Sequence, residues 1–154
     1  MRKPSKSLQI PSYRFLTLED FEFLCFDLAR ELLSYEEPIP DYATRDIPLL
    51  ESAVSNPSRQ FNGELLYPTL CKQAAILFFS IIKNHPFRNG NKRVAVMGLL
   101  AHLALNKMWI NLHPTQLYQI ACDVAQSLPS EKAEQIENLE AIIQKHMISL
   151  PSVE

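Results

Sequence analysis

The sequence has few cysteines, and their spacing does not suit pairing. There are three cysteines, Cys25, Cys71 and Cys122, which is an odd number. They lie far apart and include no Cys-x-x-Cys pair. This pattern argues against a disulfide framework and against a zinc site. Each cysteine falls within an apolar helical pattern, so we expect small core residues in a reducing compartment. The expected location is the cytoplasm.

Neither a large net charge nor a long apolar run is present. The formal net charge is −2 over 154 residues, which gives no support for a nucleic-acid partner. The basic residues 1–9 lead into Pro11 and polar residues, so we expect no secretory signal. No segment reaches the length of a membrane span, and we expect no membrane partner. With 47% hydrophobic and 21% charged residues, the composition is typical of one globular domain.

Hydrophobic periodicity predicts an all-α bundle over residues 17–150, preceded by an irregular, loosely attached arm over residues 1–16. The first helix should begin at a Thr17–Asp20 capping box and end by Pro38. Further helices are expected at 48–54, 69–84, 91–106, 114–127 and from 130 to Pro151, with 108–112 as a short extended connection. The helix at 69–84 is apolar on more than one side, which predicts a central position.

The periodicity also predicts which residues face the core. Gly98 costs its helix about 1 kcal/mol relative to alanine, so we expect close helix packing there. The expected core residues are Leu18, Phe21, Leu24, Cys25, Leu28 and Leu32; then Leu70, Ala74, Leu77, Phe78, Ile81 and Ile82; then Val94, Met97, Leu100, Ala101 and Leu103; then Leu117, Ile120, Ala121, Val124 and Leu128; and last Ile136, Leu139, Ile142 and Ile143.

Residues 59–68 differ from their helical surroundings. Phe61, Leu65 and Tyr67 flank Asn62-Gly63, and Asn-Gly is a strong signal for a tight hairpin turn. A two-stranded hairpin and an irregular surface loop both agree with this pattern, and the sequence alone does not decide between them.

Residues 83–93, Lys-Asn-His-Pro-Phe-Arg-Asn-Gly-Asn-Lys-Arg, have a composition that folding alone does not explain. Gly90 and Asn91 suit a tight turn, and Asn91 is expected to cap the helix that follows. The positive end of that helix dipole and the cations of Lys92 and Arg93 would meet there, which predicts an anion such as phosphate. His85 can accept a proton from a hydroxyl near neutral pH. Together these residues suggest phosphoryl or nucleotidyl transfer.

The same stretch resembles the signature of the Fic/Doc (Fido) family, and most closely its death-on-curing (Doc) branch, H-x-F-x-D-(A/G)-N-K-R. The matching residues are His85, Phe87, Gly90, Asn91, Lys92 and Arg93. Similarity extends through residues 49–53, 63–70 and 94–106. The resemblance implies a helical Fido bundle with a β-hairpin flap beside the active-site loop. It therefore favours the hairpin at 59–68, with Phe61, Asn62, Gly63, Glu64 and Leu65 docking the target by strand addition.

The resemblance also assigns roles at the loop. It implies that His85 is the catalytic base, that Phe87 anchors the loop, and that residues 90–93 bind the phosphates of ATP. The family has a magnesium-binding carboxylate where this chain has Asn89, and an amide oxygen is a weak ligand for Mg²⁺. We therefore expect Asn89 to be at most a weak ligand for Mg²⁺. Lys92 matches the Doc branch, which transfers the γ-phosphate, whereas glycine stands there in the AMP-transferring Fic branch.

By this resemblance we expect a Doc-like toxin that phosphorylates a hydroxyl of a cytosolic protein, such as a translation factor, and is inhibited by a separate antitoxin. Residues 130–135, Ser-Glu-Lys-Ala-Glu-Gln, only approach the family's inhibitory motif, and we expect an ordinary helix start there. Two alternatives stay open. One is an AMP transferase of the Fic type, and the other is a non-catalytic Fido protein that binds a partner.

Overall fold

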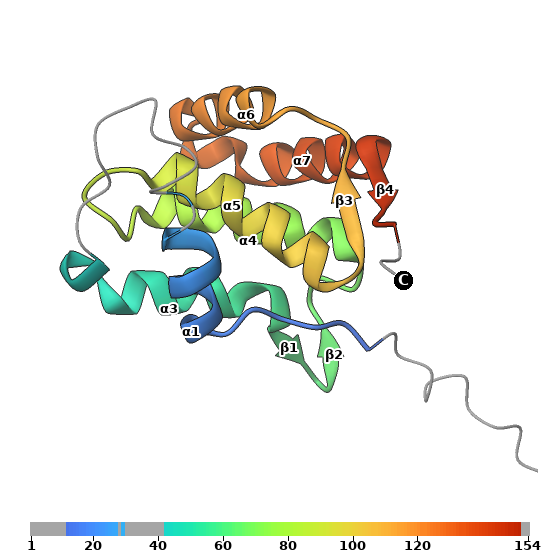
Figure 1. Cartoon of the computed structure of the whole chain (residues 1–154), viewed down its shortest axis with the longest axis horizontal. Helices are drawn as coiled ribbons and strands as arrows, with labels where there is room; N and C mark the ends of the chain where they lie inside the picture. Colours follow the sequence, from blue (N-terminus) through green and yellow to red (C-terminus); the bar gives the residue numbers. More distant parts are fainter. Residues whose placement is uncertain (1–11, 28, 30–41, 152–154) are drawn as a thin grey trace, which may run out of the picture.

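The computed structural model describes residues 12–27, 29 and 42–151 and has the expected helical architecture. Helix α4 (Leu70–Asn84) lies at the centre and contacts α3 (Ile47–Ser55), α5 (Asn91–Leu105), α6 (Pro114–Gln126) and α7 (Lys132–His146). Figure 1 shows α6 and α7 on one side of α4 and α5, with α3 on the other. Most of α4 is buried, which confirms the central position that its composition predicts.

The first helix starts as predicted but continues differently. Thr17 and Asp20 form the capping box of α1 (Leu18–Asp20), and the chain then passes into a π-helical turn, η2 (Phe21–Asp27). A π-helix repeats at a spacing of five residues, so Phe21 and Phe26 share the buried face. Leu18 is 38% exposed, and its expected core position is wrong. The side chains of Leu24 and Cys25, and all of Leu28 and Leu32, lie outside the described residues.

The segment before α4 contains the predicted short helix and hairpin. Asp46 caps α3 by accepting a hydrogen bond from the backbone N–H of Leu49. The short helix η3 (Tyr42–Thr44) precedes α3, and η4 (Asn56–Ser58) follows it. Strands β1 (Gln60–Phe61) and β2 (Glu64–Leu65) then pair antiparallel. Both turn residues have positive φ, 51° at Asn62 and 78° at Gly63, as a tight hairpin turn requires.

Helices α4 and α5 pack closely at Gly98. A Cβ atom added to this residue would lie 3.2 Å from Cδ1 of Ile81 and 3.4 Å from Cε2 of Phe21. The expected close approach of helices is therefore confirmed, and its physical cause is the absence of a side chain at this crossing. The expected core residues of α4 and α5 are buried, apart from Leu70, Met97 and Ala101, which are partly buried and pack against the core.

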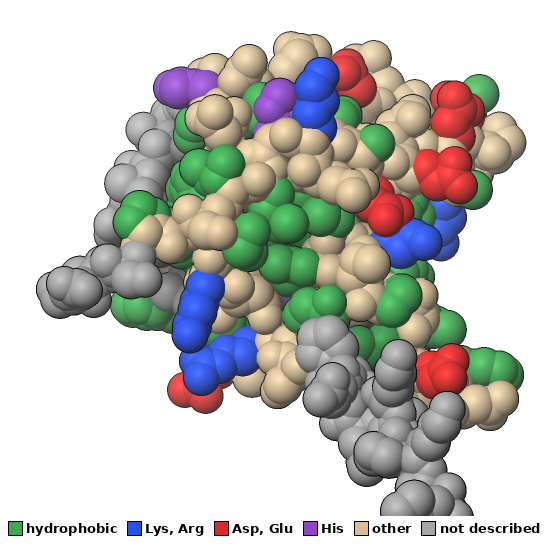
Figure 2. Space-filling model, turned by 90° about the vertical axis from the view of Figure 1, so that its right-hand side faces the viewer, with side chains coloured by type: hydrophobic (Ala, Val, Ile, Leu, Met, Phe, Trp, Pro, Cys, Tyr) green, Lys and Arg blue, Asp and Glu red, His purple; other side chains and the backbone are tan. Residues whose placement is uncertain are grey.

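A second strand pair was not predicted. The expected extended connection forms β3 (Met108–Ile110), which pairs antiparallel with β4 (Met147–Ser149), so the last helix ends at His146 rather than near Pro151. Trp109 lies opposite Ile148 in this pair, and both are partly exposed. Figure 2 shows hydrophobic side chains gathered on the face that carries these strands.

The last two helices begin and end near the expected positions. His113 caps α6 through its imidazole, and the short helix η5 (Pro129–Glu131) leads into α7, so residues 130–135 do form a helix start. Leu128 follows the end of α6 and is 61% exposed, which contradicts its expected core position. Among the residues that the structure describes, no helix has the length and apolar character to cross a membrane.

Part of the expected N-terminal arm is described, and it is irregular. Residues 12–16 form no helix or strand, but they are attached to the end of α5. The backbone of Arg14 exchanges two hydrogen bonds of 2.9 Å with the side chain of Asn106, and Phe15 stacks on His102. Leu16 is buried. This part of the arm is therefore bound to the bundle, while residues 1–11 lie outside the described part.

Candidate functional site

The loop between α4 and α5 is shaped by left-handed backbone conformations at its two ends. His85 ends α4 with φ 52° and ψ 54°, and its N–H still donates to the carbonyl of Ile81. Pro86 follows and cannot continue the helix because it lacks an N–H. At the other end Gly90 has φ 82°, which glycine adopts without the steric cost of a side chain, and α5 begins at the next residue.

Phe87 anchors the loop to the core. Its side chain is 2% exposed, and its ring centroid lies 5.0 Å from that of Phe26 and 6.1 Å from that of Tyr42. Next to it, the carbonyl of Pro86 accepts a hydrogen bond of 2.8 Å from the N–H of Asp46, at the start of α3. The loop is thus held from both sides, while Arg88 at its tip is exposed.

Asn91 does not cap α5 as the sequence suggested. Gly90 is the N-cap and has no side chain to offer, and Asn91 is the first helical residue. Its buried amide instead reaches back into the loop, where Oδ1 accepts from the N–H of Phe87 (3.0 Å) and Nδ2 donates to the carbonyl of Phe87 (2.7 Å). The left-handed Gly90 turns the chain so that this side chain points inward, and Asn91 therefore closes the loop.

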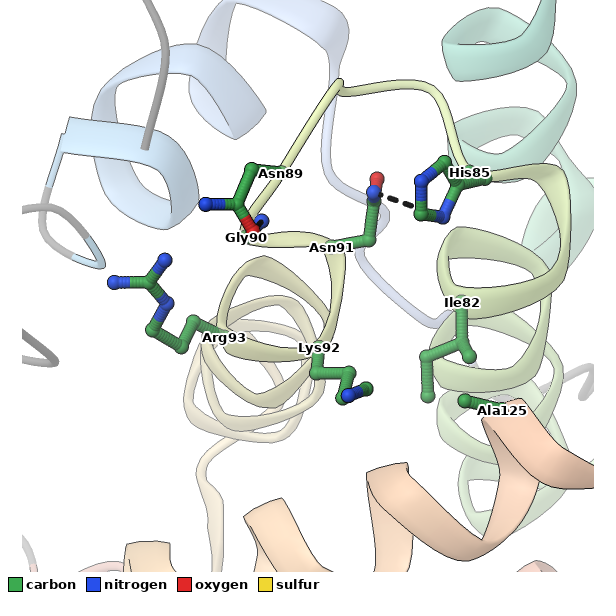
Figure 3. A pocket seen from close by; sticks show the side chains of 8 residues that line it. All are labelled: Ile82, His85, Asn89, Gly90, Asn91, Lys92, Arg93 and Ala125. Atoms are coloured by element: carbon green, nitrogen blue, oxygen red, sulfur yellow. Dashed lines mark hydrogen bonds between the residues drawn. The ribbon is translucent and has the colours of Figure 1, made fainter. Parts of the chain in front are cut away.

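The same amide contacts the catalytic candidate. Nδ2 of Asn91 lies 3.1 Å from Nδ1 of His85, and Figure 3 shows this bond. The two bonds to Phe87 fix which end of the amide is NH₂, so Asn91 is the donor and Nδ1 of His85 must be the acceptor. A neutral imidazole held in this way carries its proton on Nε2. His85 is otherwise exposed, and in this arrangement its lone pair faces Asn91.

Both basic candidates line one pocket with His85, but they lie on different sides of α5. Figure 3 shows Lys92 directed toward Ile82 and Ala125, and Arg93 directed away from them on the side of Asn89. Nζ of Lys92 is 5.8 Å from the ring centroid of Tyr118 in α6. Arg93 is only 1% exposed. The sequence predicted two adjacent charges, whereas the structure places them around the helix end.

The start of α5 suits an anion. No side chain caps it, because Gly90 stands at the N-cap, and its first turn contains no acidic residue. The N–H groups at such a helix start and the helix dipole attract negative charge, and phosphate binds at such ends in many proteins. The pocket in front of it has a volume of about 130 Å³, smaller than most sites for whole ligands. This space suits phosphate groups rather than a complete nucleotide.

The lining residues do not suit a magnesium ion held by the protein. The pocket is lined by Ile82, His85, residues 89–93 and Ala125, none of which is a carboxylate. Oδ1 of Asn89 accepts a hydrogen bond of 2.8 Å from the N–H of Gly90. In the part of the chain that is described, no group of three or more His, Cys, Asp or Glu residues could hold a metal. Magnesium prefers charged oxygen ligands, which this donor set lacks.

The structure does not bring the predicted flap residues into this pocket. Residues 61–65 form the hairpin, but none of them lines the space between His85 and Arg93. The structure instead adds Tyr118 and Ala125 from α6, which sequence reasoning missed because no local pattern reports a contact across the bundle. Lys83 holds α6 in place by donating to the carbonyl of Ser127 (2.7 Å).

Comparison with known proteins agrees with the loop signature. The Fic/DOC family model matches residues 17–103, which is more than half of the chain and includes the site loop. Toxin Doc from Mycolicibacterium smegmatis is 39% identical over 62 residues, which is 40% of this chain and 48% of that protein. The chain thus matches about half the length of this relative. No solved structure matches the chain. Because the family model covers most of the bundle and the whole loop, the chain belongs to the Fic/Doc family.

Proposed function

We propose that this protein is a Doc-like toxin that transfers the γ-phosphate of ATP to a hydroxyl group of a protein. The proposal is supported by the family match and by similarity to a protein named Toxin Doc. The site itself supports phosphate chemistry through the helix start at Gly90 and the cations of Lys92 and Arg93. A cytosolic target, such as a translation factor, is the corresponding proposal for the substrate.

The position of Lys92 is the observation that favours transfer of the γ-phosphate over transfer of AMP. Its side chain extends along the pocket wall toward Ile82 and Ala125, and so occupies space on that side of the loop (Figure 3). The AMP-transferring branch has glycine here, which leaves room for phosphates beyond the reacting one. With lysine in that space, the terminal phosphate is the one best able to approach His85. The Fic-type AMP transferase therefore becomes the weaker candidate.

The proposed step forms one bond and breaks one bond. The target oxygen attacks the γ-phosphorus, the bond to the β-phosphate oxygen breaks, and ADP leaves while His85 takes the hydroxyl proton. This requires an unprotonated ring nitrogen facing the target, whereas the bond from Asn91 occupies Nδ1 and leaves a proton on Nε2. We infer that the exposed ring turns, or loses the bond to Asn91, when target and nucleotide bind.

Labelled ATP tests the reaction. Purified protein is incubated with a bacterial lysate and ATP labelled at either the α- or the γ-phosphate. The proposal predicts transfer of the γ-label only, lost in His85→Ala and Arg93→Ala and retained in Arg88→Ala. Arg88 is the matched control because it is an exposed arginine of the same loop that does not line the pocket. Transfer of the α-label would show AMP transfer instead.

A second candidate is a non-catalytic Fido protein that binds a partner. Two observations favour it: the lone pair of His85 faces Asn91, and Asn89 stands where the family has a metal ligand. The discriminating experiment is Asn89→Asp. If this variant transfers phosphate in the presence of Mg²⁺ while the natural protein transfers none under the same conditions, the natural protein is the non-catalytic form.

We also propose that a separate antitoxin protein inhibits the enzyme. Residues 130–135 only approach the family's inhibitory motif and form an ordinary helix start, which supports inhibition by a separate protein. Expression of the protein should arrest growth, and co-expression of a small protein encoded next to it should restore growth. His85→Ala should remove the arrest without a partner. Equal arrest by His85→Ala and the natural protein would exclude a catalytic toxin.

A further inference from the structure

A second, larger cavity lies along α4, between η4 and the start of α7. We call it the basic groove and define it by Ile76, Phe79 and Ser80 on its floor, Asn56 and Arg59 on one wall, and Lys132 on the other. The floor residues belong to α4 and are almost completely buried, whereas Arg59 and Lys132 are exposed. The groove has a volume of about 460 Å³, which is within the range of ligand sites. It is distinct from the pocket at the loop, because the two share no lining residue.

The charged residues that line the basic groove are all basic. They are Arg59, Lys83 and Lys132, and no acidic residue lines the groove. The nearby carboxylate of Glu131 is engaged elsewhere, since it accepts a hydrogen bond of 2.9 Å from the N–H of Leu128. Cations on opposite walls of a cleft with an apolar floor concentrate positive potential, and they attract an anionic ligand.

The position of the basic groove connects the hairpin with the catalytic loop. One end is at Arg59 and Tyr67, which flank the hairpin, and the carbonyl of Arg59 accepts a hydrogen bond from the N–H of Leu66 that closes its base. The other end is at Lys83 and Asn84, and the next residue is His85. A chain that paired with the hairpin edge and placed a hydroxyl at His85 would therefore pass along this groove.

The polar groups of the wall and floor suit an extended peptide. Nδ2 of Asn56 on the wall donates to Oγ of Ser80 on the floor at 2.8 Å, so the groove offers an amide and a hydroxyl as well as the aromatic side chain of Phe79. Backbone groups of a peptide can hydrogen-bond to such side chains, while its acidic side chains approach the cations at the rim. A phosphate alone would contact the cations but would fill only part of a groove of about 460 Å³.

We propose that the basic groove binds an acidic segment of the protein substrate and leads its acceptor hydroxyl to His85. This rests on the proposed function, because it names the substrate class of that reaction as a protein with acidic residues beside the modified serine, threonine or tyrosine. Specificity then arises outside the phosphate pocket, from Arg59 and Lys132 together.

The test is a binding measurement that needs no catalysis. A fluorescein-labelled peptide that alternates glutamate and serine is compared with the same peptide carrying glutamine for each glutamate, using fluorescence anisotropy. The glutamate peptide should bind more tightly than the glutamine peptide, and its binding should weaken with added salt. The double variant Arg59→Gln/Lys132→Gln should bind it about tenfold more weakly, since each ion pair is partly exposed. Lys107→Gln/Lys145→Gln removes two exposed cations away from the groove and should bind like the natural protein.

Three results would overturn the proposal. The first is equal binding of the two peptides, and the second is equal loss of binding in the two double variants. The third is displacement of the labelled peptide by a single-stranded oligonucleotide at a lower concentration than the unlabelled glutamate peptide requires. The last would identify a nucleic-acid surface. The phosphate site is checked separately, because Arg59→Gln/Lys132→Gln should bind ATP like the natural protein, and His85→Ala should bind the peptide unchanged. Peptide binding without any phosphate transfer would support the groove and refute the kinase.

Discussion

Acid should destabilise the protein through His102, a buried histidine outside the candidate site. Its side chain is 1% exposed, and burial lowers the pKa of His102 from 6.5 to about 4. The hydrogen bonds around His102 show which ring nitrogen carries the proton in the neutral form. Nε2 of Gln73 donates to the carbonyl of Tyr67, so Oε1 of Gln73 faces His102 and accepts from its Nε2–H at 3.2 Å. Protonation keeps this bond but places a charge on Nδ1 in the core.

The size and sign of the effect follow from the two pKa values. The unfolded chain takes up the proton near pH 6.5, whereas the folded protein takes it up near pH 4. Between these values the unfolded state binds more protons, so the free energy of unfolding falls as the pH falls. A difference of about 2.5 pKa units corresponds to roughly 3 kcal/mol. This contribution of His102 is complete above about pH 6.5 and is lost as the pH falls to about 4.

Urea denaturation of the natural protein and of His102→Gln over this pH range measures the effect. The difference between the two proteins isolates His102, because their other titrating groups are the same. The free energy of unfolding of the natural protein should fall by roughly 3 kcal/mol more than that of the variant between about pH 7 and pH 4. Parallel pH profiles, or an NMR titration of the His102 ring with a midpoint near 6.5, would refute the reasoning.

Three further variants probe the packing and the loop. Gly98→Val should lower the free energy of unfolding by about 1 to 3 kcal/mol in urea denaturation, because even a Cβ would lie 3.2 Å from Ile81. Asn91→Leu leaves the buried N–H and carbonyl of Phe87 without their partner, and should cost about 2 to 4 kcal/mol by the same assay and abolish ATP binding in calorimetry. Asn89→Asp should make ATP binding depend on Mg²⁺, which calorimetry with and without the metal detects; unchanged metal dependence would contradict the role assigned to this position.

Features that depend on a few adjacent residues could be predicted from the sequence. The capping box at Thr17 and Asp20, the cap at Asp46 and the turn at Asn62-Gly63 all form as their local patterns indicate. Each is stabilised by bonds or backbone preferences within about four residues, so no knowledge of the rest of the fold is needed. The central position of α4 also follows from its own composition.

Features that depend on distant partners could not be predicted in this way. Strand β4 forms because residues 147–149 meet β3, whose own sequence indicates only an extended segment. The pairing of Trp109 with Ile148 joins positions far apart in the chain. In η2 the π-helical spacing of five residues places Phe26 on the same buried face as Phe21, which an α-helical pattern does not predict.

At the site, too, the sequence predicted which residues come together but not how their side chains are oriented. Motif spacing predicted that residues 85–93 gather at one loop, and the structure places six of them around one pocket. The expectation from motif spacing placed the charges of Lys92 and Arg93 together, whereas consecutive residues of a helix are turned by about 100°, so the two side chains diverge. Two cations on different sides of a helix start are poorly placed to hold one phosphate group. They are better placed for consecutive phosphates that cross the helix end, which is the arrangement a nucleoside triphosphate provides.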